Sequence, residues 1–110
     1  MDKDTEKKLS AFPDSIKEGL SASTPFCITE EMVAGFSELT GDKSPLHTER
    51  DFARRSMYRQ QVVHGMLPIG FISLLDTFQE DSFLCSIIEL SVQFIGPVFI
   101  NDKLSLNAVV

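Results

Sequence analysis

The segment FSELTGDKSPLHTERDFA, residues 36–53, combines the end of one helix, a tight turn and the start of another helix. Gly41 predicts the end of the first helix, because glycine adopts the left-handed backbone conformation at low cost. Pro45 excludes a regular helix through the residues between Asp42 and His47. A carboxylate and an imidazole held side by side on a rigid turn are suited to general acid–base chemistry.

The residues before this turn predict a helix that follows a short strand. Residues 26–28 form an apolar run that is typical of a strand and ends at Thr29. Thr29 is a favourable N-cap, and the two glutamates after it stabilise the positive end of a helix. Apolar residues recur at helical spacing between Thr29 and Gly41, namely Met32, Val33, Phe36 and Leu39.

A second, shorter helix is expected after the turn. The segment Thr48-Glu49-Arg50-Asp51 resembles a capping box with Asp in place of the usual Glu or Gln at its last position. The helix that it opens is expected to carry Phe52 and Ala53 towards the core. Residues 54–61 are polar and predict an exposed loop.

Residues 65–78 predict a buried helix, because their apolar side chains lie on nearly every side for about four turns. Pro68 is tolerated in the first turn, where its missing N–H costs little. Residues 98–100 are predicted to be extended, residues 101–102 to turn, and residues 104–110 to alternate as a strand. The strand period is also present between residues 82 and 95, with Ile88, Leu90, Val92 and Phe94 on one face.

These elements predict an α+β fold in which a long central helix packs against the concave face of a curved antiparallel sheet. Three strands are too few to cover a helix that is apolar all round. We therefore expect a domain truncated before its last strands, or one whose sheet is completed by a neighbouring chain. Residues 1–20 predict a polar, partly mobile lead-in with one loosely docked helix, and residues 21–110 the domain itself.

The composition excludes some classes of partner and compartment. A net charge of −6 argues against nucleic acid, since phosphate binding needs a basic face. No apolar stretch approaches the roughly 20 residues that cross a bilayer, and the charged start does not resemble a signal peptide. Cys27 and Cys85 are expected as buried thiols rather than a disulfide. The sequence thus predicts a soluble, cytoplasmic protein.

Two segments together resemble the MaoC-like (R)-specific enoyl-CoA hydratases. One is FSELTGDKSPLH, residues 36–47, with Ala53 six positions later, and the other is VHGML, residues 63–67. The resemblance covers about residues 26–110 and keeps the order and separation of the two segments. It implies a hotdog fold, in which an antiparallel sheet wraps a long helix and two chains usually form a homodimer with a continuous sheet. It also implies that the last one or two strands are absent here.

The resemblance further implies the addition of water across the 2,3 double bond of an acyl thioester. In the family, the residues that match Asp42 and His47 hold the catalytic water, with the Asp as the proposed base and the His orienting the water or carrying the proton. The thioester oxygen gains negative charge as the enolate develops and needs preset donors. The backbone N–H of Gly65, at the positive end of the central helix, is the expected donor.

Six further residues are candidates for substrate binding. Ser44 stands where the family commonly has Asn, and it still donates and accepts hydrogen bonds in a turn. His64 is expected to support the loop or the helix entry rather than transfer a proton. In some relatives a Ser at the position of Ser73 bonds near the active-site Asp, but a helix Ser equally bonds its own backbone. The full set is Ser44, His64, Met66, Ser73, Arg54 and Arg55.

Two groups of residues have both a binding and a structural interpretation. The arginines at positions 50, 54, 55 and 59 either meet the phosphates of coenzyme A or phosphopantetheine, or form a solvated polar loop. Met57, Tyr58, Met66 and Leu67 either border an acyl tunnel or belong to the core. Taken alone, Asp42 would be a turn-forming residue and His47 a loop histidine.

The predicted function is an (R)-specific enoyl-CoA hydratase or 3-hydroxyacyl-thioester dehydratase, which is a hydro-lyase. Its substrate would be an acyl-CoA or an acyl-carrier-protein thioester, and no metal or separate cofactor is expected. The alternative is a non-catalytic hotdog module that binds acyl thioesters or mediates dimerisation within a larger enzyme. Thioester hydrolysis, which other hotdog enzymes perform, is disfavoured by the Gly-Asp-x-x-Pro-x-His pattern.

Overall fold

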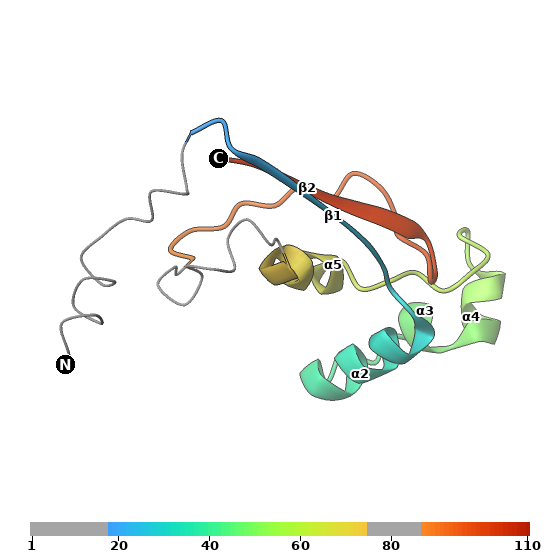
Figure 1. Ribbon diagram of the computed structural model, residues 1–110. Coiled ribbons are helices and arrows are strands. Elements are labelled where there is room, and N and C mark those ends of the chain that lie inside the picture. Colours follow the sequence, from blue (N-terminus) through green and yellow to red (C-terminus); the bar gives the residue numbers. More distant parts are fainter. Residues whose placement is uncertain (1–17, 75–86) are drawn as a thin grey trace.

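The computed structural model describes residues 18–74 and 87–110 (Figure 1). Four predictions lie wholly or partly outside these ranges: the helix of the lead-in, the last four residues of the central helix (75–78), the start of the strand between residues 82 and 95, and the environment of Cys85. The elements, in chain order, are β1 (Ser21–Cys27), α2 (Glu30–Thr40), α3 (Pro45–Thr48), α4 (Arg50–Arg55), α5 (Met66–Gly70), the 3-10 helix η1 (Phe71–Leu74) and β2 (Lys103–Val109).

Strands β1 and β2 pair antiparallel, from Ser21 opposite Val109 to Cys27 opposite Lys103. Burial alternates along both strands, as expected when one face of a sheet packs and the other meets solvent. The strand predicted at residues 26–28 is confirmed in type, although it begins earlier. The alternation predicted for the last residues of the chain is confirmed as β2.

The turn predicted at residues 101–102 is also present. Asn101 has a positive φ of 66°, a conformation that Asn tolerates better than most residues. The Asp102 side chain accepts a hydrogen bond from the Phe99 N–H at 3.0 Å, and the Asp102 N–H donates to the Phe99 carbonyl at 3.2 Å. This turn reverses the chain into β2.

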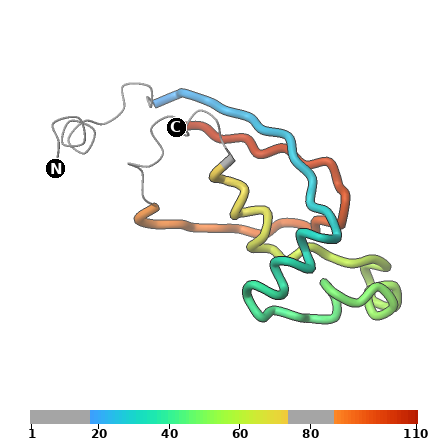
Figure 2. Tube along the Cα trace, turned by 60° about the horizontal axis from the view of Figure 1, so that its bottom comes forward, coloured from blue at the N-terminus to red at the C-terminus, as the bar shows by residue number. Residues whose placement is uncertain are grey.

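The core lies between the β1–β2 pair, the start of α2 and the start of α5. The Phe26 and Phe71 rings stack with centroids 4.8 Å apart and join β1 to η1. Figure 2 shows α5 and η1 lying between the strand pair and residues 87–98. The buried side chains Ile28, Val33 and Val63 form the centre, against which six half-buried ones pack: Phe26, Leu67, Phe71, Val98, Ile100 and Leu104.

Helix α2 has the two ends that its sequence predicts. The Thr29 hydroxyl accepts a hydrogen bond from the Met32 N–H at 3.2 Å, and Gly41 takes the left-handed conformation at φ 82°. Two of the apolar residues at helical spacing do not pack inward, because Leu39 is 85% exposed and Met32 is also exposed. The buried face instead holds Val33 and Ser37, which are four positions apart and therefore share one side of the helix.

The capping box predicted at residues 48–51 is wrong. Pro45 starts the short helix α3, as proline at N1 does, and Thr48 ends it by donating its hydroxyl hydrogen to the Ser44 carbonyl at 3.1 Å. Helix α4 begins after Glu49 without a side-chain cap. Of the two residues expected to point inward, Ala53 is buried and Phe52 is half exposed. Arg54 and Arg55 belong to α4, so the exposed loop is shorter than predicted.

In its described part, residues 87–95, the strand predicted between residues 82 and 95 is not formed. Residues 87–97 contain no strand, and in the described part of the chain only Val62 and Phe99 form a bridge nearby. Ile88 is 97% exposed, although the alternation placed it on a packed face. An extended segment becomes a strand only when a neighbour satisfies its N–H and C=O groups, and no described segment lies in register with it.

The described start of the central helix is less buried than predicted. Its α-helical part ends at Gly70 and continues as η1, and Leu67, Phe71 and Ile72 are half-buried, whereas Met66 is more than half exposed. The two strands of the described residues cannot wrap a helix on all sides, which explains the exposure. Cys27 is a free, exposed thiol rather than a buried one, because it lies on the outward face of β1. Across residues 18–74 and 87–110, every helix is too short or too polar to span a bilayer.

Candidate active site

The turn after α2 is built by the side chains of Thr40 and Asp42. The Thr40 hydroxyl donates to the Phe36 carbonyl at 2.8 Å and accepts from the Asp42 N–H at 3.2 Å. One carboxylate oxygen of Asp42, Oδ1, then accepts from the Ser44 N–H at 3.2 Å, which is an Asx turn. These bonds fix the backbone around Asp42, while its side chain remains exposed.

His47 lies on α3 and is tied to the segment before α5. Its Nδ1 lies 2.5 Å from the Val62 carbonyl oxygen. A carbonyl oxygen only accepts, so Nδ1 carries the hydrogen, and in the neutral ring Nε2 keeps its lone pair. The Gln61 side-chain amide donates to the His47 carbonyl at 2.8 Å. His47 is therefore held at both its ring and its backbone, with a hydrogen-bond acceptor left on the ring.

His64 is only 2% exposed and lies next to both Asp42 and His47. Its Nε2 lies 3.0 Å from the Asp42 carbonyl oxygen and 3.2 Å from the Ser37 hydroxyl oxygen. Its ring lies against that of His47 in a tilted arrangement, with centroids 4.1 Å apart and planes inclined by 31°. The structure thus brings Asp42, His47 and His64 together, with one ligand atom from each within 4.8 Å of the others.

This trio is better arranged for a water molecule than for a metal ion. Histidine holds a metal through an in-plane lone pair. The two imidazole rings instead lie against each other with planes inclined by 31°, and His64 Nε2 and His47 Nδ1 already have backbone partners. A water molecule needs only hydrogen-bond acceptors such as the Asp42 carboxylate and His47 Nε2. The expectation that no metal takes part stays a prediction.

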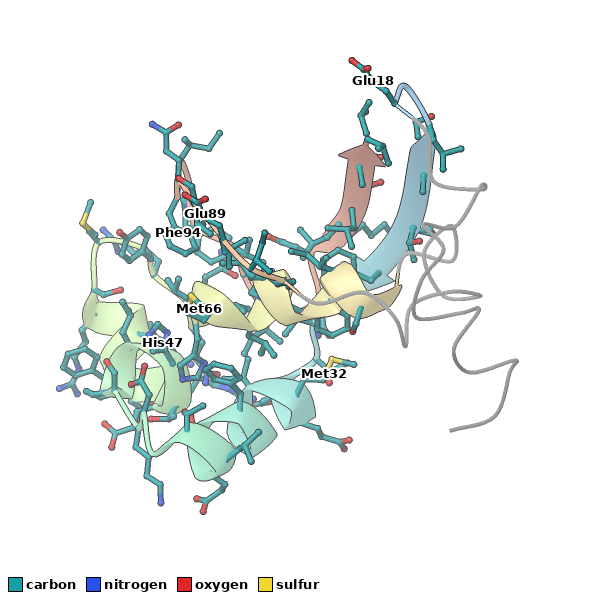
Figure 3. All side chains as sticks on the ribbon, turned by 90° about the vertical axis from the view of Figure 1, so that its left-hand side faces the viewer. Glu18, Met32, His47, Met66, Glu89 and Phe94 are labelled. Atoms are coloured by element: carbon teal, nitrogen blue, oxygen red, sulfur yellow. The ribbon has the colours of Figure 1, made fainter. Side chains whose placement is uncertain are left out.

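Gly65 precedes α5 and lies in close contact with Phe94. A Cβ atom added at Gly65 would be 2.9 Å from a carbon of the Phe94 ring, which real Cβ atoms do not tolerate. Figure 3 shows His47, Met66 and Phe94 gathered around the start of α5. Only glycine lets the residue 94 ring approach the helix start this closely.

His47 and Gly65 line one cavity of about 750 Å³. Apolar side chains form much of its wall. Of the four residues given a tunnel interpretation, Tyr58 lines this cavity, whereas Met57, Met66 and Leu67 do not. The volume falls within the range of roughly 300–1,000 Å³ that is typical of small-molecule sites. The lining residues are His47, Tyr58, Val62, Val63, Gly65, Pro68, Ile69, Val92, Gln93, Phe94, Ile95, Gly96, Pro97 and Val98.

The other candidate residues fall in different places. Met66 and Ser73 line a separate cavity of about 340 Å³, and the Ser73 hydroxyl donates to the Gly70 carbonyl at 3.1 Å. Ser44 is half-buried at the start of α3, and its side chain makes no capping hydrogen bond. The structure therefore does not place Met66 in the wall of the cavity that His47 shares with Gly65.

The arginines separate into two sets. Arg54 and Arg59 line a third cavity, of about 290 Å³, whereas Arg55 does not. Arg50 also lines it, and its guanidinium Nη2 lies 3.1 and 3.2 Å from the two carboxylate oxygens of Glu30. Because Glu30 balances the charge of Arg50, the positive charge of this cavity comes mainly from Arg54 and Arg59.

Three residues that the sequence did not single out complete the site. Ser37 and Gln61 hold the two histidines, and Phe94 covers Gly65. Ser37 had a detectable signal, since it is a polar residue four positions after Val33 on a face that the helix buries. Gln61 and Phe94 act through contacts between segments far apart in the chain, for which a single sequence carries no periodic pattern.

A sequence profile of the MaoC-like domain matches residues 11–110. The chain belongs to the MaoC-like domain family. The match includes the turn with Asp42 and His47 and the segment with His64 and Gly65. The family resemblance inferred from those two segments is confirmed.

Relatives of this MaoC-like domain include proteins named as enzymes and solved structures. It is 32% identical over 97 residues to an (R)-specific enoyl-CoA hydratase of Rhodospirillum rubrum, and 29% identical over 89 residues to a 3-hydroxybutyryl-CoA dehydratase of Methylorubrum extorquens. The solved (R)-hydratase of A. caviae, which is involved in PHA biosynthesis, superposes with a TM-score of 0.77 at 30% identity. The solved protein af1124 of Archaeoglobus fulgidus superposes with a TM-score of 0.75 at 28% identity, and these two structural neighbours confirm the hotdog fold.

The chain spans only part of each relative. The alignments cover 88% of it and 67% of the Rhodospirillum protein, and 81% of it and 57% of the Methylorubrum protein. For the A. caviae structure the coverage is 87% of this chain and 73% of the other. The shared part contains the whole described cluster around Asp42 and His47.

Proposed function

We propose that this MaoC-like protein is an (R)-specific enoyl-CoA hydratase, which reversibly adds water to a 2-enoyl thioester. One observation carries the proposal: Asp42 and His47 lie together, with ligand atoms within 4.8 Å, and His47 opens on the same cavity as Gly65. The relatives named as enoyl-CoA hydratase and 3-hydroxybutyryl-CoA dehydratase support the same reaction class.

The proposed reaction uses the two acceptors on either side of a water molecule. The water donates its hydrogens to the Asp42 carboxylate and to His47 Nε2, so that an oxygen lone pair faces C3 of the enoyl group. Asp42 takes one proton as the oxygen bonds to C3, and the electron pair of the double bond moves towards the thioester carbonyl. A proton is then returned to C2, either directly or through His47, which gives the 3-hydroxyacyl thioester.

The thioester carbonyl needs a donor where negative charge develops. In this proposal the Gly65 N–H supplies it, since Gly65 lines the same cavity as His47 and has no side chain in the way. The loss of one such donor typically costs roughly 10²–10³ in rate. The Phe94 ring beside Gly65 would keep bulk water from the thioester.

The carrier of the acyl group is assigned as coenzyme A or phosphopantetheine, with no separate cofactor. Support for a phosphate contact comes from Arg54 and Arg59, which line one cavity on the α4 side of the molecule. Exposed arginines pair with phosphate oxygens through bidentate hydrogen bonds. Arg55, which does not line this cavity, is left out of the proposed contact.

The proposal includes a homodimer and a cytoplasmic location. Residues 87–95 expose several large apolar side chains, including Ile87, Ile88 and Ile95, and a second copy of the chain would cover them. The exposed free thiol of Cys27 suits a reducing compartment. Sedimentation at several protein concentrations tests the dimer, and a single monomer mass throughout would contradict it.

The decisive experiment is a hydration assay with crotonyl-CoA and longer 2-enoyl thioesters, read as loss of the enoyl-thioester absorbance. Asp42→Asn should lower kcat by at least roughly 10³-fold, because it removes the base and keeps the shape of the side chain. Asp51→Asn is the matched control, since Asp51 is an exposed acid in the first turn of α4. Binding of acyl-CoA without any turnover would instead support the non-catalytic module.

A further inference from the structure

We propose that His64 is a positioning residue. Together His64 and Ser37 form a clamp that fixes the positions of Asp42, His47 and Gly65 relative to one another. The inference rests on the proposed function, because it concerns the site that holds Asp42, His47 and Gly65. Neither Ser37 nor His64 needs to touch the substrate for this role. Both act through the backbone and the rings that they hold.

The first observation is the burial of two polar side chains that face each other. Ser37 is 3% exposed on α2, and His64 is 2% exposed just before α5. A buried polar group is costly unless it finds a hydrogen-bond partner. The Ser37 hydroxyl oxygen and His64 Nε2 lie 3.2 Å apart and so supply each other with one. This contact joins α2 to the start of α5.

The second observation sets the direction of the hydrogen bonds. His64 Nε2 is also 3.0 Å from the carbonyl oxygen of Asp42, and a carbonyl oxygen only accepts. Nε2 therefore carries the hydrogen and shares it between Asp42 and Ser37. His64 is the residue before Gly65 in the chain. Its Nε2–H therefore holds the backbone of Asp42, the proposed base, at a fixed position relative to Gly65, the proposed donor to the thioester carbonyl.

The third observation concerns the faces of the His64 ring. The Phe36 ring lies against it with a centroid distance of 4.7 Å, and the His47 ring with one of 4.1 Å. His47 is thus fixed by Val62 at one edge and by His64 at one face. The position of His47 Nε2, which is proposed to hold the water, depends on both contacts.

The fourth observation separates positioning from simple packing. In the described part of the chain, Nδ1 of His64 is buried and has no hydrogen-bond partner. A side chain that served packing alone would be better as an apolar residue of the same size, because a buried unpaired nitrogen costs stability. What histidine adds here is the Nε2–H donor at the right reach. Glutamine offers a similar donor, and leucine offers none.

The consequence for catalysis follows from geometry. The water must lie between Asp42 and His47 and face a thioester held at Gly65, so an error in any of the three positions lowers the rate. A displacement of about 1 Å costs on the order of 10²-fold in such a site. Loss of the clamp should therefore lower kcat and leave KM nearly unchanged, since substrate contacts remain.

The test compares His64→Gln, His64→Leu and Ser37→Ala with the parent protein in the crotonyl-CoA assay. We expect His64→Leu to lower kcat by about 10²-fold and Ser37→Ala by a few-fold, with KM within about twofold. His64→Gln should recover most of the kcat that His64→Leu loses. Ser23→Ala, at an exposed position of β1, is the control for the serine change and should keep the parent kcat.

A second measurement does not depend on activity. Nitrogen-15 NMR of the parent protein should show His64 with hydrogen on Nε2 and an unprotonated Nδ1. The inference is overturned if the hydrogen is on Nδ1, or if Ser37→Ala and His64→Leu both fold and keep the parent kcat. If His64→Leu does not fold, Ser37→Ala decides alone, and a parent value of its kcat overturns the inference. A parent protein without hydratase activity contradicts the proposed function, while the NMR result still judges the clamp.

Discussion

The side-chain amide of Gln61 donates a hydrogen bond to the backbone carbonyl of His47 over 2.8 Å. The next residue, Val62, accepts from the His47 ring through its own carbonyl. Two consecutive residues therefore hold both the backbone and the imidazole of one proposed catalytic residue. A loop that precedes α5 thus sets the orientation of a side chain on α3.

Gln61→Leu should disturb His47 without touching substrate. The His47 carbonyl would lose its partner while partly buried, which we expect to lower the free energy of unfolding by about 1–2 kcal/mol. The value of kcat should fall several-fold because α3 is less firmly held. Urea unfolding and the hydration assay measure the two effects.

Gln60→Leu is the matched control for that change, because Gln60 is exposed and makes no such bond within the described residues. Gln60→Leu should leave the free energy of unfolding and kcat near the parent values. Equal effects of the two leucine substitutions would show that the Gln61 bond does not matter.

Gly65→Ala should reveal how closely Phe94 packs on the start of α5. The new Cβ would lie 2.9 Å from the ring, so the ring must move. Phe94 is 61% exposed and its ring has room to swing outward, so the cost should be moderate, about 1 kcal/mol in unfolding free energy. Activity should fall more strongly, because the displaced ring and the new methyl group both change the thioester site.

Combining Gly65→Ala with Phe94→Ala isolates this contact. In a double-mutant cycle the two changes should couple by at least about 0.5 kcal/mol, because the smaller residue 94 removes the clash. Urea unfolding of the four proteins gives the coupling energy. Strictly additive unfolding free energies would mean that the ring does not press on Gly65.

The positions where local chemistry decides the backbone were the ones that the sequence predicted well. Thr29 and Gly41 bound α2 as expected, and the strand period at the end of the chain became β2. The residue types and spacing around Asp42 and His47 also pointed to the family, which the profile match confirms. Each of these features depends on neighbours within a few residues.

The failures have two physical causes, a competing local signal and contacts between segments far apart in the chain. Thr48 has a capping-box pattern but bonds backward to Ser44, because Pro45 had already started a helix. Ile88 has the strand period but no described neighbour to pair with. The partners of His64 lie 27 and 22 positions away in the chain. Contacts of that range are settled by the tertiary fold, and local patterns in one sequence do not encode them.

Two glycines of the same region should respond to alanine with opposite signs. Gly41 has a φ of 82°, where a Cβ is strained, so Gly41→Ala should lower the unfolding free energy by about 1–2 kcal/mol. Gly35 lies inside α2 with open space around it, so Gly35→Ala should raise it by up to about 1 kcal/mol. Thermal unfolding of both variants checks the signs. Stabilisation by Gly41→Ala would contradict the left-handed end of α2.

Arg54 and Arg59 offer the sharpest test of how the substrate is carried. Both line the cavity beside α4, whereas the adjacent Arg55 does not. If the phosphates of coenzyme A bind there, Arg54→Gln and Arg59→Gln should each raise KM for crotonyl-CoA by about three- to tenfold, the effect of losing one exposed charge-assisted hydrogen bond. The value of kcat should stay near that of the parent, because the arginines do not contact the reacting atoms.

Arg55→Gln is the matched control, because it removes the same charge one residue away from Arg54. Its KM should stay within about twofold of the parent value, and added salt should reduce the difference between the two variants. Crotonyl-pantetheine, which lacks the nucleotide phosphates, should show no difference between Arg54→Gln and Arg55→Gln. If Arg54→Gln and Arg55→Gln raised KM for crotonyl-CoA equally, the cause would be the change in overall charge and not a phosphate contact in this cavity.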